Sequence, residues 1–321
     1  MSVINTTIVI PVFNDWLSVS KLIPQIDTVG KEAQIKISLV LVNDGSDEVS
    51  SLDITKTFQS IGSIEILHLA CNLGHQRAIA VGLVDISNKS DSEVVIVMDG
   101  DGEDRPEDIK LLIDEYRNSD ANCIVVAKRD KRSEGMVFKI SYFFYKLLFR
   151  LLTGEKIDFG NYCLLPKRLL CRLVYKDSLW NHLAATVLRS NNDLRMVSTC
   201  RGNRIDGKAK MNFTGLVLHG LSAISIFNDR VLVRAMKFFI LMSVIIAGLA
   251  FAFSIVSVLL YSEVVQIILI ACFILFILTC LLLFISVALL LVELSSRSKN
   301  SVVPVKESAN YVQSIESIYE S

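Results

Sequence analysis

Short apolar runs rich in β-branched residues alternate with longer segments of helical periodicity in the N-terminal half of the chain. The runs are Thr7–Val12, Ile37–Val42, Ile64–Leu69, Val94–Val97 and Cys123–Ala127. Between them, apolar residues recur with a spacing of three and four, as at Ile109, Leu112 and Ile113. Strands that alternate with helices across short turns predict an α/β fold with a parallel, doubly wound sheet.

The middle of the chain continues this pattern with two further strands and two apolar helices. Residues 157–165 and 194–199 have the composition of strands. The segment 136–152 is apolar but carries interspersed Lys and Arg and is too short to span a bilayer, so it predicts a helix in the membrane interface. A buried core helix is the alternative. A second helix with little charge is predicted at 213–227.

Two long uncharged runs dominate the C-terminal third. Phe238–Tyr261 and Val264–Val292 are each long enough to cross a bilayer at ~1.5 Å per residue, and two residues separate them. They predict a tight transmembrane hairpin. Basic residues flank both ends, which places both ends in the cytoplasm by the positive-inside rule. The predicted organisation is a cytoplasmic domain over 1–230, the hairpin over 231–294 and a flexible cytoplasmic tail over 295–321.

Charge and cysteine usage narrow the class of protein. The chain of 321 residues has a formal net charge of zero, which argues against a nucleic-acid partner. Its seven cysteines show no paired spacing, which is typical of a reducing compartment. No charged start precedes a hydrophobic run at the N-terminus, so no signal peptide is expected.

Polar clusters follow four of the predicted strands directly. Their sequences are FND, NDGSD, NLGHQR and DGDGED, and each comes where an apolar run ends. The carboxyl ends of parallel strands meet at one edge of a sheet, where open α/β folds bind their ligands. We therefore expect the four clusters to converge on one crevice, although each alone is more typical of a turn.

The last of these clusters is the candidate metal site. Asp99 and Asp101 are two residues apart, so their carboxylates point to the same side of an extended chain. Adjacent acids repel one another unless a cation lies between them, and Mg²⁺ or Mn²⁺ prefers oxygen ligands. Glu103 could complete the coordination. An acidic surface turn is the alternative.

Basic residues later in the chain suit the phosphates of a substrate. Arg129, Arg132, Arg204 and Lys210 can bind phosphate oxygens, and Gly207 permits close approach of a phosphate to the backbone. The alternative role for the basic side chains is attraction to anionic lipids at the membrane surface.

Taken together, the motifs PVFND, VNDGSDE, NLGHQRAIAVGL and MDGDGEDRPED resemble those of family-2 glycosyltransferases with the GT-A fold. The resemblance covers about residues 5–230. It is strongest to the dolichyl-phosphate-mannose-synthase-like branch, including bacterial enzymes that load sugars onto undecaprenyl phosphate, and the C-terminal hairpin matches this branch too. It implies a membrane-anchored hexosyltransferase that contributes to cell-envelope polysaccharide.

The resemblance also implies roles for individual residues. The nucleotide-sugar would contact Pro11, Asp15, Asp44, Asn72, Gly74 and Asp99. The metal would be held by Asp99, Asp101 and Glu103, and Asp101 would be catalytic. Arg204, Gly207 and Lys210 match a phosphate-binding loop of the form Arg-x-x-Gly-x-Ser-Lys.

Three positions depart from this family pattern, the first being Glu103, where Gln is commoner. Ala209 replaces the serine of the phosphate-binding loop, and Asn161 replaces an Asp that has been proposed as a base. An amide cannot accept a proton usefully, so Asp158 is the best remaining catalytic carboxylate. A phosphate acceptor is already ionised and needs little help from a base, whereas a hydroxyl acceptor does.

The resulting hypothesis is inverting transfer of a sugar from a nucleotide-sugar to a polyprenyl phosphate at the cytoplasmic face of the membrane. UDP is the expected nucleotide and GDP is the alternative. Two other functions stay open: transfer to a sugar hydroxyl of a lipid-linked glycan, and a catalytically silent membrane scaffold that binds nucleotide-sugar. A homo-oligomer is a further prediction from the resemblance.

Overall fold

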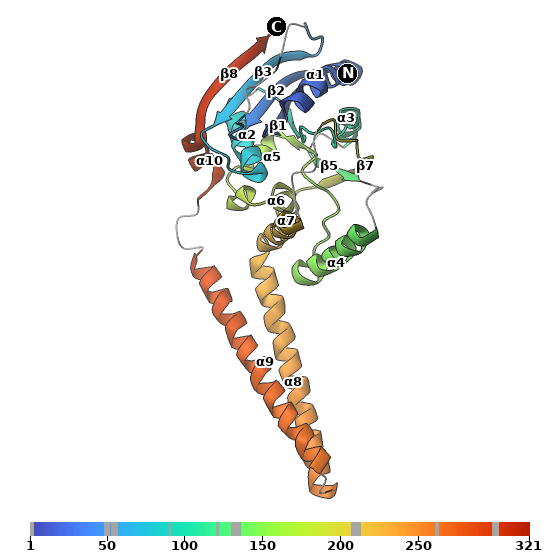
Figure 1. The fold of residues 1–321 in the computed structure, drawn as a ribbon, viewed down its shortest axis with the longest axis vertical. Coiled ribbons are helices and arrows are strands. Elements are labelled where there is room, and N and C mark those ends of the chain that lie inside the picture. The colour runs from blue at the N-terminus through green and yellow to red at the C-terminus, as the bar shows by residue number, and fades with distance from the viewer. Residues whose placement is uncertain are drawn as a thin grey trace. The chain divides into compact units, whose positions relative to one another are not determined.

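The computed structural model describes residues 3–47, 52, 57–89, 91–119, 122–129, 136–206, 213–260, 263–296 and 302–321. The chain forms two compact units. The first contains Met1–Phe143, Ile157–Ile226 and Val302–Ser321, and the second contains Phe144–Lys156 and Phe227–Ser301. Figure 1 shows the elements of both units.

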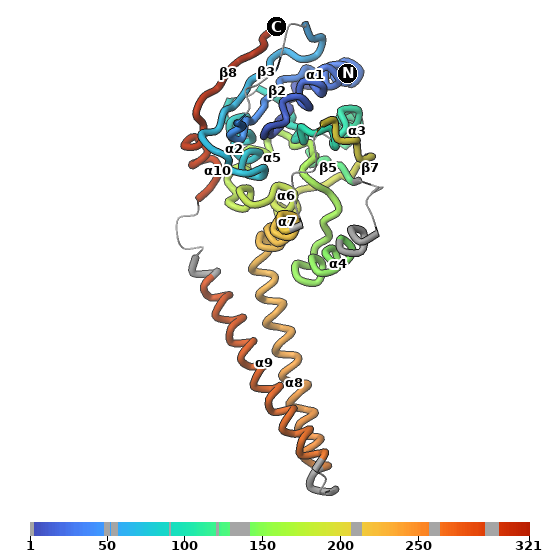
Figure 2. The backbone as a smooth tube through the Cα atoms, viewed as in Figure 1, coloured from blue at the N-terminus to red at the C-terminus, as the bar shows by residue number. Residues whose placement is uncertain are grey.

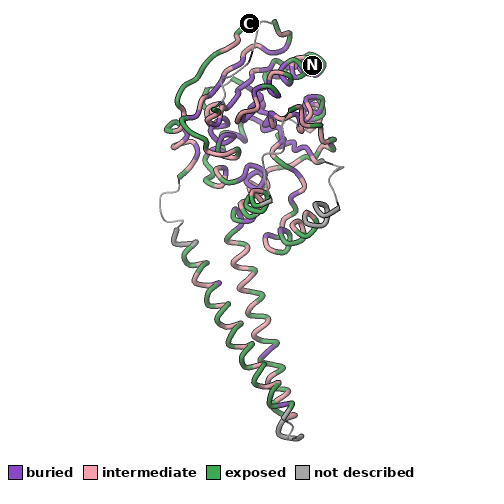
Figure 3. The backbone as a smooth tube through the Cα atoms, viewed as in Figure 1, coloured by how far each residue is buried: buried purple, intermediate pink, exposed green. Residues whose placement is uncertain are grey.

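The first unit is built on an eight-stranded sheet with the order β7-β5-β6-β4-β1-β2-β3-β8. Its strands are β1 (Ile4–Val12), β2 (Ile35–Asn43), β3 (Ile61–Leu69), β4 (Val94–Val97), β5 (Ile124–Arg129), β6 (Cys163–Pro166), β7 (Leu194–Thr199) and β8 (Val312–Glu320). The inner strands consist almost entirely of buried apolar residues, which Figure 3 shows in purple. Such continuous apolar runs are typical of strands that are covered on both faces.

The helices of this unit cover both faces of the sheet. They are α1 (Trp16–Glu32), α2 (His75–Lys89), α3 (Asp108–Asn118), α5 (Lys167–Leu173), α6 (Leu183–Arg189), α7 (Phe213–Ser225) and α10 (Pro304–Glu307), with 3₁₀ turns η1 (Asp177–Trp180) and η2 (Ser308–Tyr311). Apolar residues of α1 and α3 share one core with Ile8 and Ile10 of β1. Gly82 of α2 lies against Val9 and Val42, which point to the opposite face. The doubly wound α/β prediction is therefore confirmed for the centre of the sheet.

The sheet is mixed, whereas the sequence pattern predicted a parallel one. Strand β6 runs antiparallel to both β4 and β5. It is also shorter than the predicted strand, because residues 157–162 lie outside it and only Cys163–Pro166 pair. Apolar composition identified the strand, but composition carries no information about direction.

The prediction of a flexible tail at the C-terminus is wrong. Residues 312–320 form β8, which pairs antiparallel with β3 at the outer edge of the sheet (Figures 1 and 2). The Phe58 amide donates to the Tyr319 hydroxyl at 3.1 Å, and the two rings meet edge to face. The Ser and Glu residues that made this segment look unstructured are exposed on an edge strand, where polar residues are common.

The second unit consists mainly of two long apolar helices, α8 (Asn228–Leu260) and α9 (Glu263–Ser296). The segments 228–256 and 264–292 are candidate membrane spans with mean hydropathies of 2.7 and 3.3. Most of their side chains are exposed (Figure 3), as expected of helices whose apolar surface faces lipid. The second half of α4 (Met136–Thr153) also belongs to this unit.

Candidate active site

The acidic loop Asp99–Asp104 follows β4 and has a tightly determined shape. A Cβ at Gly100 would lie 3.0 Å from the Ile10 side chain, so glycine allows the loop to pack against β1. Gly102 adopts a φ of +90°, a conformation that favours glycine. The carboxylate of Asp104 is buried and accepts from the Asp99 amide at 3.0 Å, which closes the turn.

A second loop, containing Arg201 and Arg204, is bound along the acidic loop. The Gly202 amide donates to the Glu103 carbonyl at 2.8 Å, and the Ile205 amide donates to the Asp101 carbonyl at 2.9 Å. These backbone bonds make the two loops a single structure although they are distant in sequence.

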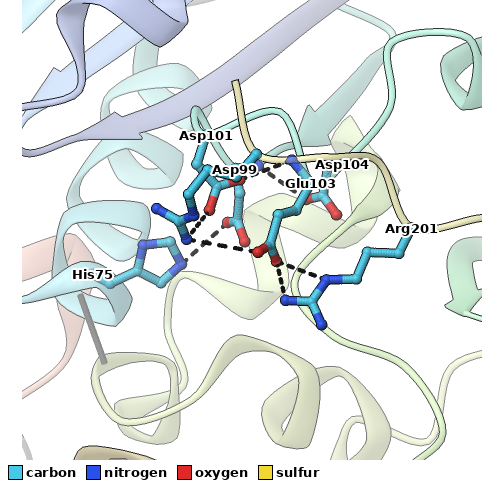
Figure 4. A network of polar contacts seen from close by, with 7 residues as sticks. His75, Asp99, Asp101, Glu103, Asp104 and Arg201 are labelled. Carbon is cyan, nitrogen blue, oxygen red and sulfur yellow. Dashed lines mark hydrogen bonds and ion pairs between the residues drawn. The ribbon is translucent and has the colours of Figure 1, made fainter. Parts of the chain in front are cut away.

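Two ion pairs join the side chains of these loops. Arg201 contacts the Glu103 carboxylate at 2.6 Å (Figure 4). Arg204 contacts the Asp101 carboxylate at 2.6 Å. Arg204 also lies 3.7 Å from the Glu103 carboxylate. Cations that suit phosphate oxygens are thus held directly beside acids that suit a divalent metal.

His75, the first residue of α2, reaches the acidic loop from the NLGHQR cluster (Figure 4). Its Nε2 lies 3.2 Å from the Asp99 carboxylate. Burial lowers the pKa of His75, but the charge of Asp99 and its hydrogen bond more than offset this, with smaller contributions from Asp104 and Asp101, so the pKa is raised. His75 therefore carries positive charge into the site more readily than a free imidazole.

A chain of side-chain amides continues from His75 to α6. The Leu183 amide donates to Gln76 Oε1 at 2.7 Å, and Gln76 Nε2 donates to Asn161 Oδ1 at 3.1 Å. Asn161 Nδ2 then lies 3.0 Å from His75 Nε2. Because a backbone amide can only donate, the bond from Leu183 fixes the orientation of both side-chain amides and turns Asn161 Nδ2, a donor, toward His75 Nε2. This contact requires an unprotonated Nε2, whereas the contact with Asp99 requires a protonated one, so Asn161 and Asp99 compete for the same ring nitrogen. Asn161 is thereby anchored at the edge of the acidic cluster.

Asp44 ties together the loops that follow β2 and β3. Its carboxylate is buried and accepts from the Leu73 amide at 2.7 Å and from the Gly74 amide at 3.0 Å. Burial raises the pKa of Asp44, and the two amides and His75 offset only part of this rise. Together with the pair between His75 and Asp99, these bonds confirm that the strand-end clusters converge.

The donor set of the acidic loop fits a divalent cation that also binds substrate phosphates. Burial raises the pKa of Asp101, and the charge of Asp99 raises it further, which shows that the two carboxylates repel one another. Among the described residues, no three His, Cys, Asp or Glu side chains are grouped as a complete metal site. Mg²⁺ is commonly held by one or two carboxylates, with waters and substrate phosphates as its other ligands. Asp99 and Asp101 fit that arrangement; Asp101 is paired with Arg204 and Glu103 with Arg201, so each of these acids also has a cationic partner.

The other predicted site residues are distributed around this centre or lie outside the described residues. Pro11 is buried near the end of β1, and Asp15 is the N-cap residue of α1. The backbone of Asn72 lies against Gly45, whose φ is +67°. Asp158 is partly exposed between α4 and β6, and Arg129 ends β5. The predicted phosphate-binding residues outside the described ranges are Arg132, Gly207 and Lys210.

Sequence patterns did not identify several side chains of this network. Arg201 is not among the predicted phosphate-binding residues, and Asp104 appears in the predictions only as part of the cluster DGDGED. Gln76 belongs to the NLGHQR cluster, and its role depends on Leu183, 107 residues later in the chain. His75 could be identified from the sequence, because it is the one histidine that lies within a polar cluster at the end of a predicted strand.

Comparison with known proteins gives a family match over the first unit. The family described as Glycosyl transferase family 2 matches residues 7–172. The uncharacterized glycosyltransferase YkcC of Bacillus subtilis is 27% identical over 247 residues, which cover 75% of this chain and 73% of that protein.

Two relatives with more specific names match over shorter segments. The dodecaprenyl-phosphate galacturonate synthase of Rhizobium johnstonii is 24% identical, and 48% of this chain matches 45% of that protein. The undecaprenyl-phosphate 4-deoxy-4-formamido-L-arabinose transferase of Klebsiella pneumoniae is 25% identical, with coverage of 48% and 46%. The alignments thus span less than half the length of these two relatives.

A solved structure with the same fold is glucosyl-3-phosphoglycerate synthase from Mycobacterium tuberculosis, in complex with Mn²⁺, UDP and phosphoglyceric acid. Its TM-score is 0.50 at 11% identity, and the match covers 71% of this chain and 78% of that chain. At this identity the likeness concerns the fold alone. It confirms the predicted GT-A type α/β fold.

Proposed function

Because the chain belongs to glycosyl transferase family 2, we propose that it transfers a sugar from a nucleotide-sugar to a polyprenyl phosphate. UDP is the expected nucleotide. The observation that carries the proposal is the joined pair of loops, in which Arg201 and Arg204 are held against the acids that follow β4. This arrangement suits a diphosphate. Its oxygens need cationic partners, and a metal ion bound by the carboxylates would offset the repulsion between those carboxylates and the diphosphate.

In the proposed reaction, Asp99 and Asp101 would hold Mg²⁺ or Mn²⁺, which would neutralise the charge that develops on the leaving diphosphate. The Arg204 guanidinium, held beside Asp101, would bind a phosphate oxygen of the same diphosphate. His75 and Asp104 hold Asp99 in place from either side. Asp44 orders the loop of Asn72 and Gly74, which would line the nucleotide site.

The acceptor is proposed to be a phosphate because the site needs no base for it. An oxygen of the lipid phosphate attacks the anomeric carbon, the bond from that carbon to the diphosphate breaks, and the nucleoside diphosphate leaves with the electron pair. A single displacement inverts the configuration at the carbon. Asn161 fits this step, because its amide, which contacts His75, adds no negative charge to the edge of the acidic cluster that would repel an anionic nucleophile.

The names of two relatives support this acceptor class, since they refer to dodecaprenyl phosphate and undecaprenyl phosphate. The candidate spans α8 and α9 would anchor the enzyme where such lipids reside. We further propose that the catalytic unit faces the cytoplasm, that α4 and α7 lie in the membrane interface, and that the product supplies cell-surface glycan synthesis.

The experiment that tests the proposal is incubation of the purified full chain with a panel of labelled nucleotide-sugars, Mn²⁺ and undecaprenyl phosphate, followed by extraction of the lipid. The expected result is label in the lipid fraction for one sugar, and only when metal and lipid phosphate are both present. Label that enters a lipid-linked glycan but never the polyprenyl phosphate would favour a hydroxyl acceptor instead. Nucleotide-sugar binding without transfer to either acceptor would indicate a silent scaffold.

A further inference from the structure

The second unit contains a cavity of about 450 Å³ between the end of α4 and the beginning of α8. Its lining consists of Thr153, Gly154, Glu155, Asp229, Arg230, Val233, Arg234 and Lys237. Arg230, Arg234 and Lys237 are spaced by four and three residues, so all three lie on one face of α8. A row of cations thus faces the end of α4.

Contacts on both sides hold this cavity in shape. Phe149 of α4 packs edge to face on Phe227, and Arg230 lies over the same Phe227 ring. Arg230 also pairs with Glu155 at 2.5 Å. The end of α4 is itself closed by hydrogen bonds, since the Thr153 hydroxyl donates to the Phe149 carbonyl at 2.7 Å.

Gly154 lies directly against the Arg234 side chain. Its φ of +83° ends the helix in the left-handed conformation that favours glycine. A Cβ at this position would collide with the Arg234 guanidinium. The guanidinium donates to the Leu151 carbonyl at 3.0 Å, so it is held at the cavity wall and its other N–H groups stay available.

The lining carries three cations, Arg230, Arg234 and Lys237, and two acids, Glu155 and Asp229, so its net charge is positive. Glu155 is engaged by Arg230, whereas Arg234 and Lys237 form no ion pair with any residue in the described part of the chain. Apolar side chains border the cations, because Phe238 and Leu241 of α8 and Leu147, Leu148 and Leu151 of α4 are exposed. The uncharged stretch of the candidate span begins directly after Lys237.

We propose that this cavity binds the phosphate of an anionic membrane lipid, with Arg234 and Lys237 as its cationic partners. A lipid satisfies both features of the site, since its phosphate meets the two cations while its chains cover the exposed apolar side chains. The lipid is either a phospholipid or a polyprenyl phosphate, which share this chemistry. The inference rests on the second unit and does not depend on the proposed transferase activity.

The test measures lipids retained by the full chain in neutral detergent, using native mass spectrometry. The probes are short-chain phosphatidylglycerol, a short-chain polyprenyl phosphate and phosphatidylcholine as the zwitterionic control. The wild-type chain is expected to retain at least one anionic probe in preference to phosphatidylcholine. Retention of phosphatidylglycerol identifies a phospholipid site, and retention of the polyprenyl phosphate alone identifies a site for that lipid.

Three variants and one matched control separate a built site from general attraction to negative charge. Lys237→Gln and Arg234→Gln should each weaken retention about fivefold, which corresponds to about 1 kcal/mol per charge near a membrane. Gly154→Ala removes no charge but displaces the guanidinium, and it should weaken retention similarly. The control Arg150→Gln removes a charge from exposed α4 outside the cavity and should have little effect.

The proposal is overturned if the wild-type chain shows no preference for either anionic probe, or if Arg150→Gln weakens retention as much as Lys237→Gln. It is also overturned if folded Gly154→Ala retains lipid as well as the wild type. Circular dichroism and thermal melting establish whether that variant folds. If Gly154→Ala does not fold, the difference in lipid retention between Lys237→Gln and Arg150→Gln still tests the proposed site.

Discussion

Arg204 and Asp101 form an ion pair of 2.6 Å although 103 residues separate them in the sequence. The pair is mostly shielded from solvent, with side-chain exposures of 22% and 17%. It joins the acidic loop after β4 to the basic loop after β7. The proposed chemistry depends on this junction, because a diphosphate needs the metal-binding and the phosphate-binding groups within reach of each other.

Arg204→Gln should reduce turnover by about 10²-fold, the usual cost of losing one electrostatic contact to a developing anion. The KM for the nucleotide-sugar should change less than kcat, since the contact strengthens as the diphosphate leaves. Steady-state kinetics of nucleoside diphosphate release provide the measurement. The control is Arg195→Gln, whose guanidinium pairs with Asp193 and is 53% exposed. Equal losses in both variants would contradict the assignment.

Asn161→Asp should raise the KM for a polyprenyl phosphate several-fold with a smaller effect on kcat. The new carboxylate would add negative charge next to His75, at the edge of the acidic cluster, where it would repel an anionic acceptor, and a several-fold rise in KM corresponds to about 1 kcal/mol. Acceptor titrations at saturating donor provide the measurement. Asn122→Asp, on the exposed surface beside Arg168, is the control. An unchanged acceptor KM would indicate that the acceptor does not approach Asn161.

His182 should make the stability of the first unit depend on pH. Burial lowers the pKa of His182 to about 3, with contributions from His219, which stacks on it at 4.4 Å, and from His75. A depressed folded-state pKa stabilises the fold above the unfolded pKa of 6.5, and this stability is lost as pH falls from there towards 3. At pH 5 the loss is about 2 kcal/mol, from 1.36 kcal/mol per unit.

The measurement is the melting temperature of the full chain in detergent at pH 7.5 and at pH 5. His182→Asn keeps an N-cap acceptor for the Ala185 amide but does not titrate. The wild type should therefore lose more thermal stability between these pH values than the variant does. An equal loss in both proteins would show that His182 is not the responsible group.

The C-terminal strand should be stable rather than mobile. Amides of β8 that face β3 are expected to exchange slowly with solvent, because they are bonded within the sheet and Tyr319 packs on Phe58. Tyr319→Ala should speed exchange across the strand and lower the melting temperature, through loss of about 1–3 kcal/mol of packing. Hydrogen exchange read by mass spectrometry provides the measurement. Rapid exchange of β8 in the wild-type chain would contradict the edge-strand assignment.

The sequence was sufficient to predict the elements whose residues are all buried, or all apolar, along the element. Strands β1, β2 and β4 are buried along most of their length, so their apolar runs were unambiguous. The acidic loop and the two candidate spans were equally clear. By contrast, β8 has an exposed face rich in Ser and Glu, and its apolar contacts come from β3 and Phe58, more than two hundred residues earlier. Local composition could not reveal that pairing.

In the site, too, local sequence patterns identified some residues, whereas contacts between distant segments were not predicted. Asp99, Asp101 and Asp44 were recognisable because acids and glycines at strand ends form a local pattern. The partners of these residues were not recognisable, because Arg201 reaches Glu103 and Gln76 reaches Leu183 only through the folded chain. Asp44 was expected to line the nucleotide pocket, and its carboxylate accepts from two backbone amides of the neighbouring loop.

The most direct measurement of the central claim compares Asp101→Asn with the wild type in the lipid-product assay, with Mn²⁺, a nucleotide-sugar and undecaprenyl phosphate present. The exposed Asp114→Asn serves as the control. The account predicts that Asp101→Asn loses metal-dependent formation of the lipid-linked sugar by about 10³-fold, while Asp114→Asn retains it. Unchanged product formation in Asp101→Asn would contradict the claim that sugar transfer takes place at the acidic loop.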